Sequence, residues 1–356
     1  MKSKSTIKVI IITLGIFFAL FTINTTNLNF NMGYCDDNTL YNKNLELLKV
    51  SGKIHIDGNS GWFDFRNAGN CTGNGTYSNP YIIKDLAING EGSGSCILIE
   101  NSDVYFRIET CSCHHSGNLW NDAGIKIYNT TNGILNNNTC HSNFFGISIL
   151  ESDNIIIFGN DVEFNMDYGI YLSYSNSNTI LVNTVKLNYW SGIYLSDCNN
   201  NTLSENIVID SQVIGILLDN NNNNNTLLEN TINSNGIGIC IIDSNKNTLS
   251  GNKANYNHDY GICFSGSVYN TVTGNTANDN RCGIYLYESN NNLISGNTFI
   301  DNDECIAEES CEGNIFENNQ CGEDDKEPII HGYNLFFLLG ILSVIVIFIS
   351  KKLKKY

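Results

Sequence analysis

The chain has 356 residues, enough for one large domain or two small ones, and a formal net charge of −17 at pH 7. Residues 36–327 hold all 36 acidic residues and 12 of the 19 basic ones, so this region has a net charge of −24. Such an acidic body argues against nucleic acid or anionic lipid as its partner, and we expect it to bind no nucleic acid.

Residues 1–30 resemble an export signal. Lys2, Lys4 and Lys8 precede an apolar run over residues 7–23, which is the order of segments in a secretory signal. No clear pair of small residues marks a cleavage site. The segment is therefore either a removed signal peptide or an uncleaved N-terminal anchor.

Residues 31–80 are expected to cover one end of the structure that follows. Residues 36–53 contain four leucines, which predict a short helix or an edge strand, and residues 53–57 predict a strand. Trp62, Phe63 and Phe65 add apolar bulk. The next 241 residues are repetitive, and a repetitive array needs such a cap because its end unit exposes apolar groups and unpaired backbone.

A short phrase containing a Gly-Ile step repeats through residues 81–321. The step returns every 22 or 23 residues, and Cys96 and Cys305 hold the glycine position in the first and last copies. The glycines are Gly124, Gly146, Gly169, Gly192, Gly215, Gly238, Gly261 and Gly283. A period in the low twenties predicts a solenoid, and each unit reads as three strands of two to four residues between polar corners.

Two solenoid folds, the leucine-rich repeat and the parallel β-helix, have repeats of this length. A leucine-rich repeat needs a leucine frame and a helical turn in each unit, whereas the frame here is Ile, Val and Asn without helical periodicity. We therefore predict an all-β fold, a right-handed parallel β-helix of about ten coils. Its successive coils would stack about 4.8 Å apart.

Asparagine makes up about one residue in six and recurs in phase with the apolar residues. Two registers are predicted to stack as amide ladders at the corners, where asparagine tolerates left-handed backbone. The first holds Asn138, Asn160, Asn183, Asn206, Asn230, Asn252, Asn275 and Asn297; the second holds Asn143, Asn165, Asn188, Asn235, Asn257, Asn280 and Asn302, with Ser211 in its gap. A disordered Asn-rich tract would not need this phase.

The C-terminal residues predict a membrane anchor. Residues 322–332 are a short acidic linker, residues 333–350 are apolar except for Asn334 and Ser343, and residues 351–356 contain four lysines. Eighteen such residues are long enough to cross a bilayer, and the basic tail should stay in the cytoplasm. We expect a single-pass protein of the plasma membrane with the β-helix outside the cell.

Thirteen cysteines fit an oxidising exterior. Aligning the copies places Cys111 and Cys140 in one register and Cys240 and Cys263 in another, within reach of a disulfide. Bonding directly adjacent parallel strands would strain the bridge, so a reduced cysteine stack stays open as the alternative.

The repeated phrase Gly-Ile-x-Leu-x-x-Ser-x-x-Asn-x-Ile-x-x-Asn resembles the parallel β-helix repeats of NosD-like periplasmic proteins. It also resembles the pectate-lyase-like superfamily, whose repeats are called carbohydrate-binding and sugar-hydrolysis domains. Residues 75–83, with Gly75-Thr76 and Asn79-Pro80-Tyr81, look like the opening of β-helix domains in archaeal surface proteins. The resemblance covers about residues 54–321. It implies the fold and leaves the activity open, because this fold hosts lyases, hydrolases, adhesins and accessory proteins.

A catalytic site has one weak candidate. Asp279 and Asp301 share a register, Asp303 falls opposite Arg281, and Glu304 follows. A carboxylate pair with a cation would suit polysaccharide cleavage. The alternative, which we favour, is a surface salt bridge near the end of the solenoid. No catalytic motif of the family is present to carry over.

Cysteines and histidines gather on neighbouring coils as Cys111, Cys113, His114, Cys140 and His141. NosD-like proteins are linked with copper-enzyme maturation, and thiolate with imidazole suits Cu(I) or zinc. A Cys111–Cys140 disulfide or inert thiols is the interpretation we favour. We therefore predict no cofactor.

Tyrosines offer a third candidate site. Tyr171 and Tyr194 are the middle residues of their strands, so they should point outward and stack one coil apart, with Tyr168 and Trp190 nearby. An exposed aromatic strip beside polar side chains suits sugar rings. The alternative is that an outward tyrosine is ordinary on a strand.

These observations predict a membrane-anchored cell-surface β-helix protein that binds extracellular polysaccharide or glycoprotein, or builds a surface layer, without catalysis. A polysaccharide lyase or hydrolase and a NosD-like metal accessory protein are the alternatives.

Overall fold

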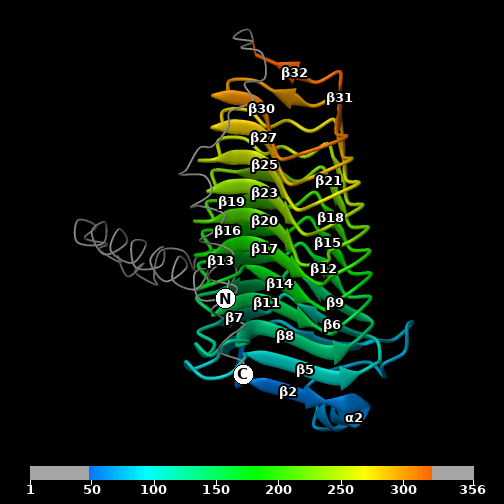
Figure 1. The fold of residues 1–356 in the computed structure, drawn as a ribbon. Helices are drawn as coiled ribbons and strands as arrows, with labels where there is room; N and C mark the ends of the chain where they lie inside the picture. Colours follow the sequence, from blue (N-terminus) through cyan, green and yellow to red (C-terminus); the bar gives the residue numbers. More distant parts are fainter. Residues whose placement is uncertain (1–47, 323–356) are drawn as a thin grey trace, which may run out of the picture. The chain divides into compact units, whose positions relative to one another are not determined.

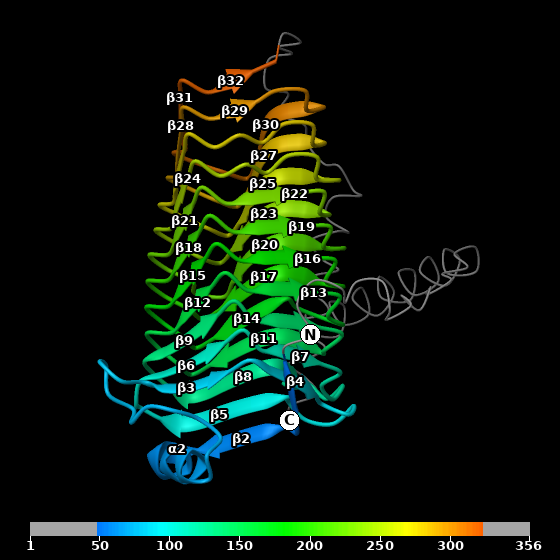
Figure 2. The same cartoon turned by 180° about the vertical axis from the view of Figure 1, so that it is seen from behind.

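The computed structural model describes residues 48–322, which wind into a parallel β-helix (Figure 1, and from behind in Figure 2). Most coils place one short strand in each of three parallel sheets, here named A, B and C, and in two of the later coils sheet A is reduced to a single bridging residue. Sheets B and C contain eleven strands each, close to the predicted number of coils. The predicted all-β solenoid is therefore confirmed, with three strands in most coils.

The strands of each sheet follow the order of the coils. Sheet A contains β1 (Lys49–Ser51), β4 (Leu86–Asn89), β7 (Ser112–His114), β10 (Thr139–His141), β13 (Asp161–Glu163), β16 (Thr184–Lys186), β19 (Ile207–Ile209) and β22 (Thr231–Asn233), and single bridges continue it toward the pair β29 (Thr298–Phe299) and β32 (Gln320–Cys321). Sheet B contains β2 (Ile54–Asp57), β5 (Ile97–Ser102), β8 (Ala123–Thr130), β11 (Phe145–Leu150), β14 (Ile170–Ser173), β17 (Ser191–Ser196), β20 (Ile214–Asp219), β23 (Ile237–Ile242), β25 (Tyr260–Ser265), β27 (Cys282–Tyr287) and β30 (Glu304–Glu309). Sheet C contains β3 (Tyr81–Lys84), β6 (Phe106–Glu109), β9 (Gly133–Asn136), β12 (Ile156–Phe158), β15 (Thr179–Leu181), β18 (Thr202–Ser204), β21 (Thr226–Leu228), β24 (Thr248–Ser250), β26 (Thr271–Thr273), β28 (Leu293–Ser295) and β31 (Ile315–Glu317).

The core is a column of inward-facing aliphatic side chains. Ile170, Ile193 and Ile216 lie over one another in sheet B and are fully buried. Equivalent residues of sheets A and C, such as Val185 and Leu203, fill the same interior. Because every coil buries the same few side chains against its neighbours, the repeat needs only a short apolar pattern to build a long core.

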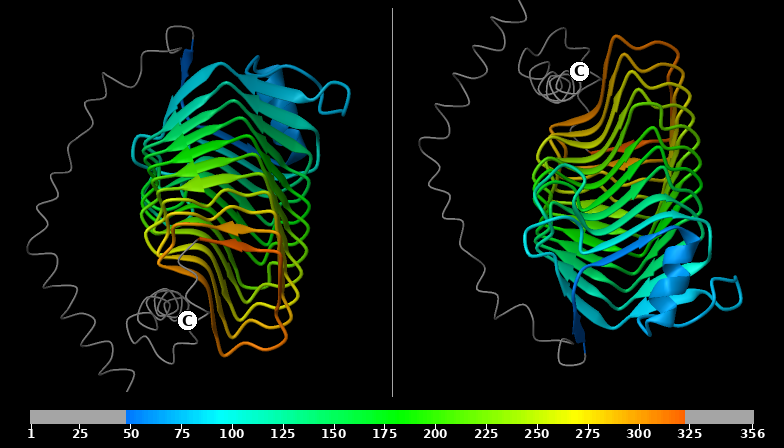
Figure 3. Two further views of the ribbon diagram at one scale, coloured as in Figure 1. Left: turned by 90° about the horizontal axis from the view of Figure 1, so that it is seen from above. Right: turned by 90° about the horizontal axis from the view of Figure 1, so that it is seen from below.

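A helix closes the N-terminal end. α2 (Gly58–Asn67) follows β2 directly and lies across the first coils, as the end-on views in Figure 3 show. Its Trp62 is fully buried and stacks on Tyr81, with ring centroids 5.2 Å apart. Phe63, expected to add to the cap, is largely exposed instead.

Both predicted asparagine ladders are present. Asn183, for example, donates through Nδ2 to the Asn206 side chain at 3.0 Å and to the Ile157 carbonyl at 2.9 Å. A third ladder, which was not predicted, joins Asn178, Asn201, Asn225, Asn247, Asn270, Asn292 and Asn314. These bonds satisfy buried backbone groups where the chain turns between sheets.

The left-handed corners differ from the prediction. The ladder asparagines do not have positive φ; the residue before each one does, whatever its type, as at Val182 (φ 55°), Glu205 (φ 54°) and Tyr256 (φ 57°). A β-branched residue such as Val182 is strained there. The hydrogen bonds made by the ladder asparagine therefore hold the preceding residue in the left-handed conformation. The asparagine's own tolerance of that conformation is not what determines the corner.

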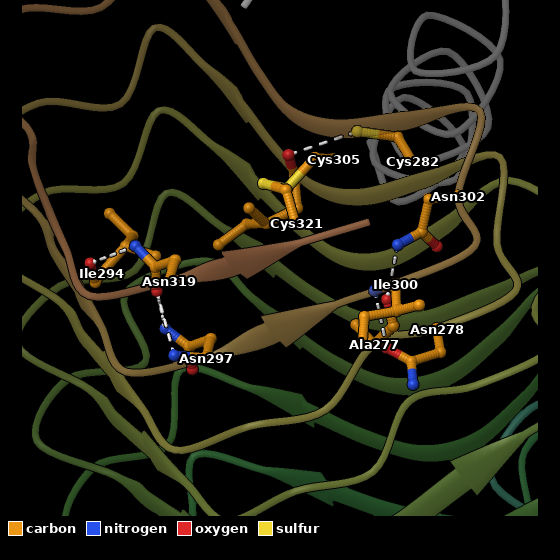
Figure 4. Close-up of a disulfide and its surroundings, with 11 residues drawn as sticks. Ala277, Asn278, Cys282, Ile294, Asn297, Ile300, Asn302, Cys305, Asn319 and Cys321 are labelled. Carbon is orange, nitrogen blue, oxygen red and sulfur yellow. Dashed lines mark hydrogen bonds between the residues drawn. A yellow bond between two sulfur atoms is a disulfide. The ribbon is translucent and has the colours of Figure 1, made fainter. Parts of the chain in front are cut away.

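A disulfide closes the last described coil. It joins Cys305 in β30 to Cys321 in β32, with a Cα–Cα distance of 5.7 Å, and lies beside the ends of the ladders (Figure 4). This pairing was not among the predicted ones.

Several predictions concern residues outside the described range. Residues 1–47 include the predicted signal and the first part of the predicted cap, and residues 323–356 include all of the predicted linker after residue 322, the anchor and the basic tail. Within residues 48–322, no helix is both long and apolar enough to cross a bilayer.

Candidate functional site

The outer face of sheet B carries a cluster of aromatic rings, named here the aromatic cluster. Its members are Trp120, Phe144, Phe145, Tyr168, Tyr171 and Tyr194. Tyr171 pairs with Tyr194 in register, and their rings stack with centroids 5.3 Å apart. Alternation along a strand sends one side chain inward and the next outward, so the predicted stacking of these two tyrosines is confirmed.

The tyrosines are not the exposed strip that we expected. Tyr171 is 8% exposed, Tyr194 3% and Tyr168 1%. The insertion between β7 and β8 is one cause: it places the Trp120 ring edge-on to Phe145 at 5.3 Å and to Tyr171 at 6.4 Å. Tyr168 adds further contacts: it stacks on Phe145 and meets the Tyr194 ring in a tilted arrangement, with centroids 4.8 Å apart. A sugar therefore cannot lie flat on Tyr171 or Tyr194 in this arrangement.

Trp120 is the accessible member of the aromatic cluster, with 42% of its surface exposed. Trp190, half-buried, packs against the same cluster from the corner between sheets A and B. Its backbone N–H donates to the Asp167 carbonyl of the preceding coil at 2.9 Å. Trp120 was not among the predicted site residues; its place in the only long insertion of the repeat was the available signal.

A buried carboxylate lies beside this cluster. Asp219, at the end of β20, is 4% exposed and accepts hydrogen bonds from the Asn220 side chain at 2.7 Å and from the Tyr194 hydroxyl at 3.4 Å. Burial raises the pKa of Asp219 to about 6. Burial, followed by the negative charge of Asp219, raises the pKa of Tyr194 far above its ordinary range, so this hydroxyl stays protonated. Asp219 could not be predicted from the sequence, because its burial depends on its own coil and on the two adjacent ones.

The predicted cysteine and histidine site is divided by the sheet. Cys140 pairs with Cys113, not with Cys111 as predicted, and both thiols are buried in the core. His114 and His141, the next residues of the same strands, point to the outer face. Cys111 instead takes the place of a ladder asparagine, with its N–H donating to Asn138. The thiols and imidazoles therefore cannot converge on one ion.

Cys111 and Cys113 are also held in the protonated thiol form, which is a poor nucleophile and metal ligand. The hydrogen bond with Cys140, then burial, raises the pKa of Cys113, and burial raises the pKa of Cys111 to about 12. Cys240 and Cys263 do pair in register, as predicted. In the described part of the chain no three His, Cys, Asp or Glu side chains already converge as a metal centre.

Within residues 48–322, the acidic group near the C-terminal coils is not paired with Arg281. Asp279 and Asp301 occupy equivalent left-handed corners, with φ of 55° and 57°, on adjacent coils. Among residues 48–322, however, no salt bridge joins Arg281 to Asp279, Asp301 or Asp303. The salt bridge that we favoured is therefore absent.

Comparison with known proteins agrees with this architecture. A family model described as "Right handed beta helix region" matches residues 54–232, half of the chain. The chain belongs to the right-handed β-helix family. A second model, described as "Periplasmic copper-binding protein (NosD)", matches residues 214–326. A comparison with curated proteins found none that matches this β-helix chain.

Solved structures share the fold at low sequence identity. A mutant of the periplasmic alginate epimerase AlgG aligns with a TM-score of 0.58 and 18% identity, covering 67% of this chain and 74% of that one. The A-module of the mannuronan C-5 epimerase AlgE6 from Azotobacter vinelandii aligns with a TM-score of 0.54 and 12% identity, covering 71% and 86%. At such identities the likeness concerns the β-helix itself.

Proposed function

We propose that this β-helix protein is held at the outer face of the plasma membrane and binds polysaccharide or glycoprotein without transforming it. The half-exposed Trp120 ring, standing on the buried aromatic cluster, carries this proposal. A ring fixed edge-on against Phe145 loses little freedom when a sugar stacks on its open face. Trp190 supplies a second apolar contact at the same corner.

Charge narrows the class of glycan. The region that contains the solenoid has a net charge of −24, so an anionic polysaccharide would be repelled at low ionic strength. Asp122, whose carboxylate accepts from the Leu119 N–H at 3.1 Å, adds an acidic group to the insertion beside Trp120. We therefore infer a neutral glycan. Attachment to the membrane rests on the apolar residues 333–350 and the lysines that follow them.

The test measures binding of the full chain, purified in detergent, to a panel of soluble neutral and anionic polysaccharides by calorimetry. Trp120→Ala should weaken binding of the recognised neutral glycan about tenfold, the effect of losing one aromatic stacking contact. Tyr269→Ala, which removes an exposed ring from a different corner, should bind as the parent does. Equal binding by the Trp120 variant, or no glycan bound at all, contradicts the proposal.

A second candidate function is polysaccharide cleavage or epimerisation, and Asp219 favours it. A carboxyl with a pKa of about 6 beside a protonated tyrosine is able to donate and accept protons near neutral pH. The fold relatives AlgG and AlgE6 are named as epimerases of alginate and mannuronan. Incubation with the same polysaccharides, followed by assays for reducing ends, unsaturated sugars and changed sugar composition, tests this candidate. Product formed by the parent chain but not by Asp219→Asn would support it and would overturn the non-catalytic proposal.

A further inference from the structure

Three histidines lie together on the outer side of sheet A, where the insertion begins. His114 ends β7 and His141 ends β10, and the two pair in register with their rings stacked 5.2 Å apart. His115 occupies the following corner with a φ of 55°. The Nδ1 atoms of His114 and His115 are 2.8 Å apart, and the two rings are nearly perpendicular.

That short separation has a chemical consequence. Two imidazole nitrogens at hydrogen-bond distance share a proton, because one must donate and the other accept. Two imidazole nitrogens about 2.0–2.1 Å from one ion lie about 3.3 Å apart at a tetrahedral zinc ion and about 2.9 Å apart at a square-planar copper(II) ion. The 2.8 Å separation in this corner therefore matches the square-planar arrangement, and the two nitrogens must move about 0.5 Å apart to hold a tetrahedral ion. A metal ion is able to bind both Nδ1 atoms once the ring that donates this hydrogen bond carries its proton on Nε2 instead.

We propose that His114 and His115 bind one divalent ion of the borderline class, such as Zn²⁺ or Cu²⁺, through their Nδ1 atoms. His141 keeps the His114 ring in place by stacking and does not need to be a ligand. Imidazole nitrogen selects these ions over Ca²⁺ and Mg²⁺, which prefer oxygen. Water completes the coordination, since His115 lies at an exposed position.

Three neighbouring side chains with ligand atoms have other surroundings. Glu163 follows His141 in the same outer column, and it pairs with the Lys186 ammonium at 3.0 Å. The thiols of Cys113 and Cys140 are on the opposite side of the sheet. The site also lies outside residues 214–326, the part of the chain that resembles the NosD model, so it does not follow from that likeness.

The experiment uses the full chain without a polyhistidine tag, titrated separately with Zn²⁺ and Cu²⁺ and assayed for bound metal after dialysis. The parent chain should retain one equivalent that His115→Asn lacks, since asparagine accepts the left-handed corner and keeps the fold intact. His114→Asn should lose the same equivalent. His258→Ala removes an exposed histidine on a distant coil and should bind as the parent does.

A Cu²⁺ spectrum and a cysteine double variant distinguish this histidine site from other possible metal sites. With Cu²⁺, the paramagnetic resonance spectrum of the parent should show coupling to nitrogen that His115→Asn loses. Full metal binding by the two corner variants overturns the proposal. So does binding that disappears in Cys113→Ser with Cys140→Ser while persisting in His114→Asn, because the thiols would then be the ligands.

Discussion

Single residues in this solenoid take their properties from the coils above and below. Val182 and Tyr256 are driven into the left-handed region because the next asparagine bonds along the ladder. Ser211 interrupts the second ladder, and its hydroxyl is buried without a hydrogen-bond partner. The solenoid tolerates the backbone strain at such corners and the unpaired Ser211 hydroxyl, because the contacts that each inner coil makes with both neighbouring coils stabilise it.

Asp219 makes stability depend on pH. Its folded pKa of about 6 exceeds the ordinary 3.8, so the folded state binds the proton more tightly than the unfolded state. This contribution is fully present below about pH 4 and is lost as pH rises through 6. The penalty at neutral pH is at most about 3 kcal/mol. We expect Asp219→Asn to gain stability over the parent as pH rises from 4 to 7.

Urea unfolding of both proteins at pH 4, 5, 6 and 7 measures this difference. The other carboxylates are common to both chains, so their titration largely cancels. A difference that does not change between pH 4 and pH 7 would show that Asp219 is not the group responsible.

At the scale of the strand, the repeated glycine sets how closely sheets A and B approach. Gly192 does not have a left-handed φ; a side chain there would meet Val208 and lie 2.8 Å from the Gly215 carbonyl oxygen. The glycine column is therefore required for close approach between coils rather than for turn conformation. The Gly-Ile step lies at the start of the sheet B strands.

Gly192→Ala should destabilise the chain by about 1–3 kcal/mol, the usual cost of overpacking a tight interior. Gly52→Ala is the matched control, because nothing lies within 4 Å of its added methyl group. Denaturant unfolding of the two variants compares them. Equal stability of Gly192→Ala and the parent would mean that the coils separate easily.

At the scale of the whole described solenoid, the two ends are protected differently. α2 and Trp62 cover the first coils, whereas the Cys305–Cys321 disulfide closes the last described coil across 16 residues. An end coil has a neighbour on one side only, so it is the part most ready to open.

Cys305→Ser with Cys321→Ser should therefore loosen the last coil and leave the centre intact. Loss of a bridge over a loop of this size costs about 3 kcal/mol in the chain-entropy description. Hydrogen exchange should accelerate in β30 to β32 and stay slow in β14 to β20. Uniform acceleration through all coils would instead indicate a global change of stability. Reductant should affect the parent but not the variant.

The amino-acid sequence by itself determined the repeat, the three strands in most coils, the inward columns and two of the three asparagine ladders. It could do so because each coil stacks on a near-copy of itself, which makes register a matter of counting. Counting failed where the insertion changes the length of one coil, and so Cys140 faces Cys113 rather than Cys111. Only the tertiary structure decided which outward rings are buried, that Asp219 lies beside Tyr194, and that thiols and imidazoles occupy opposite sides of a sheet. Those features depend on side chains from several coils and from the insertion, whose contacts no local pattern encodes.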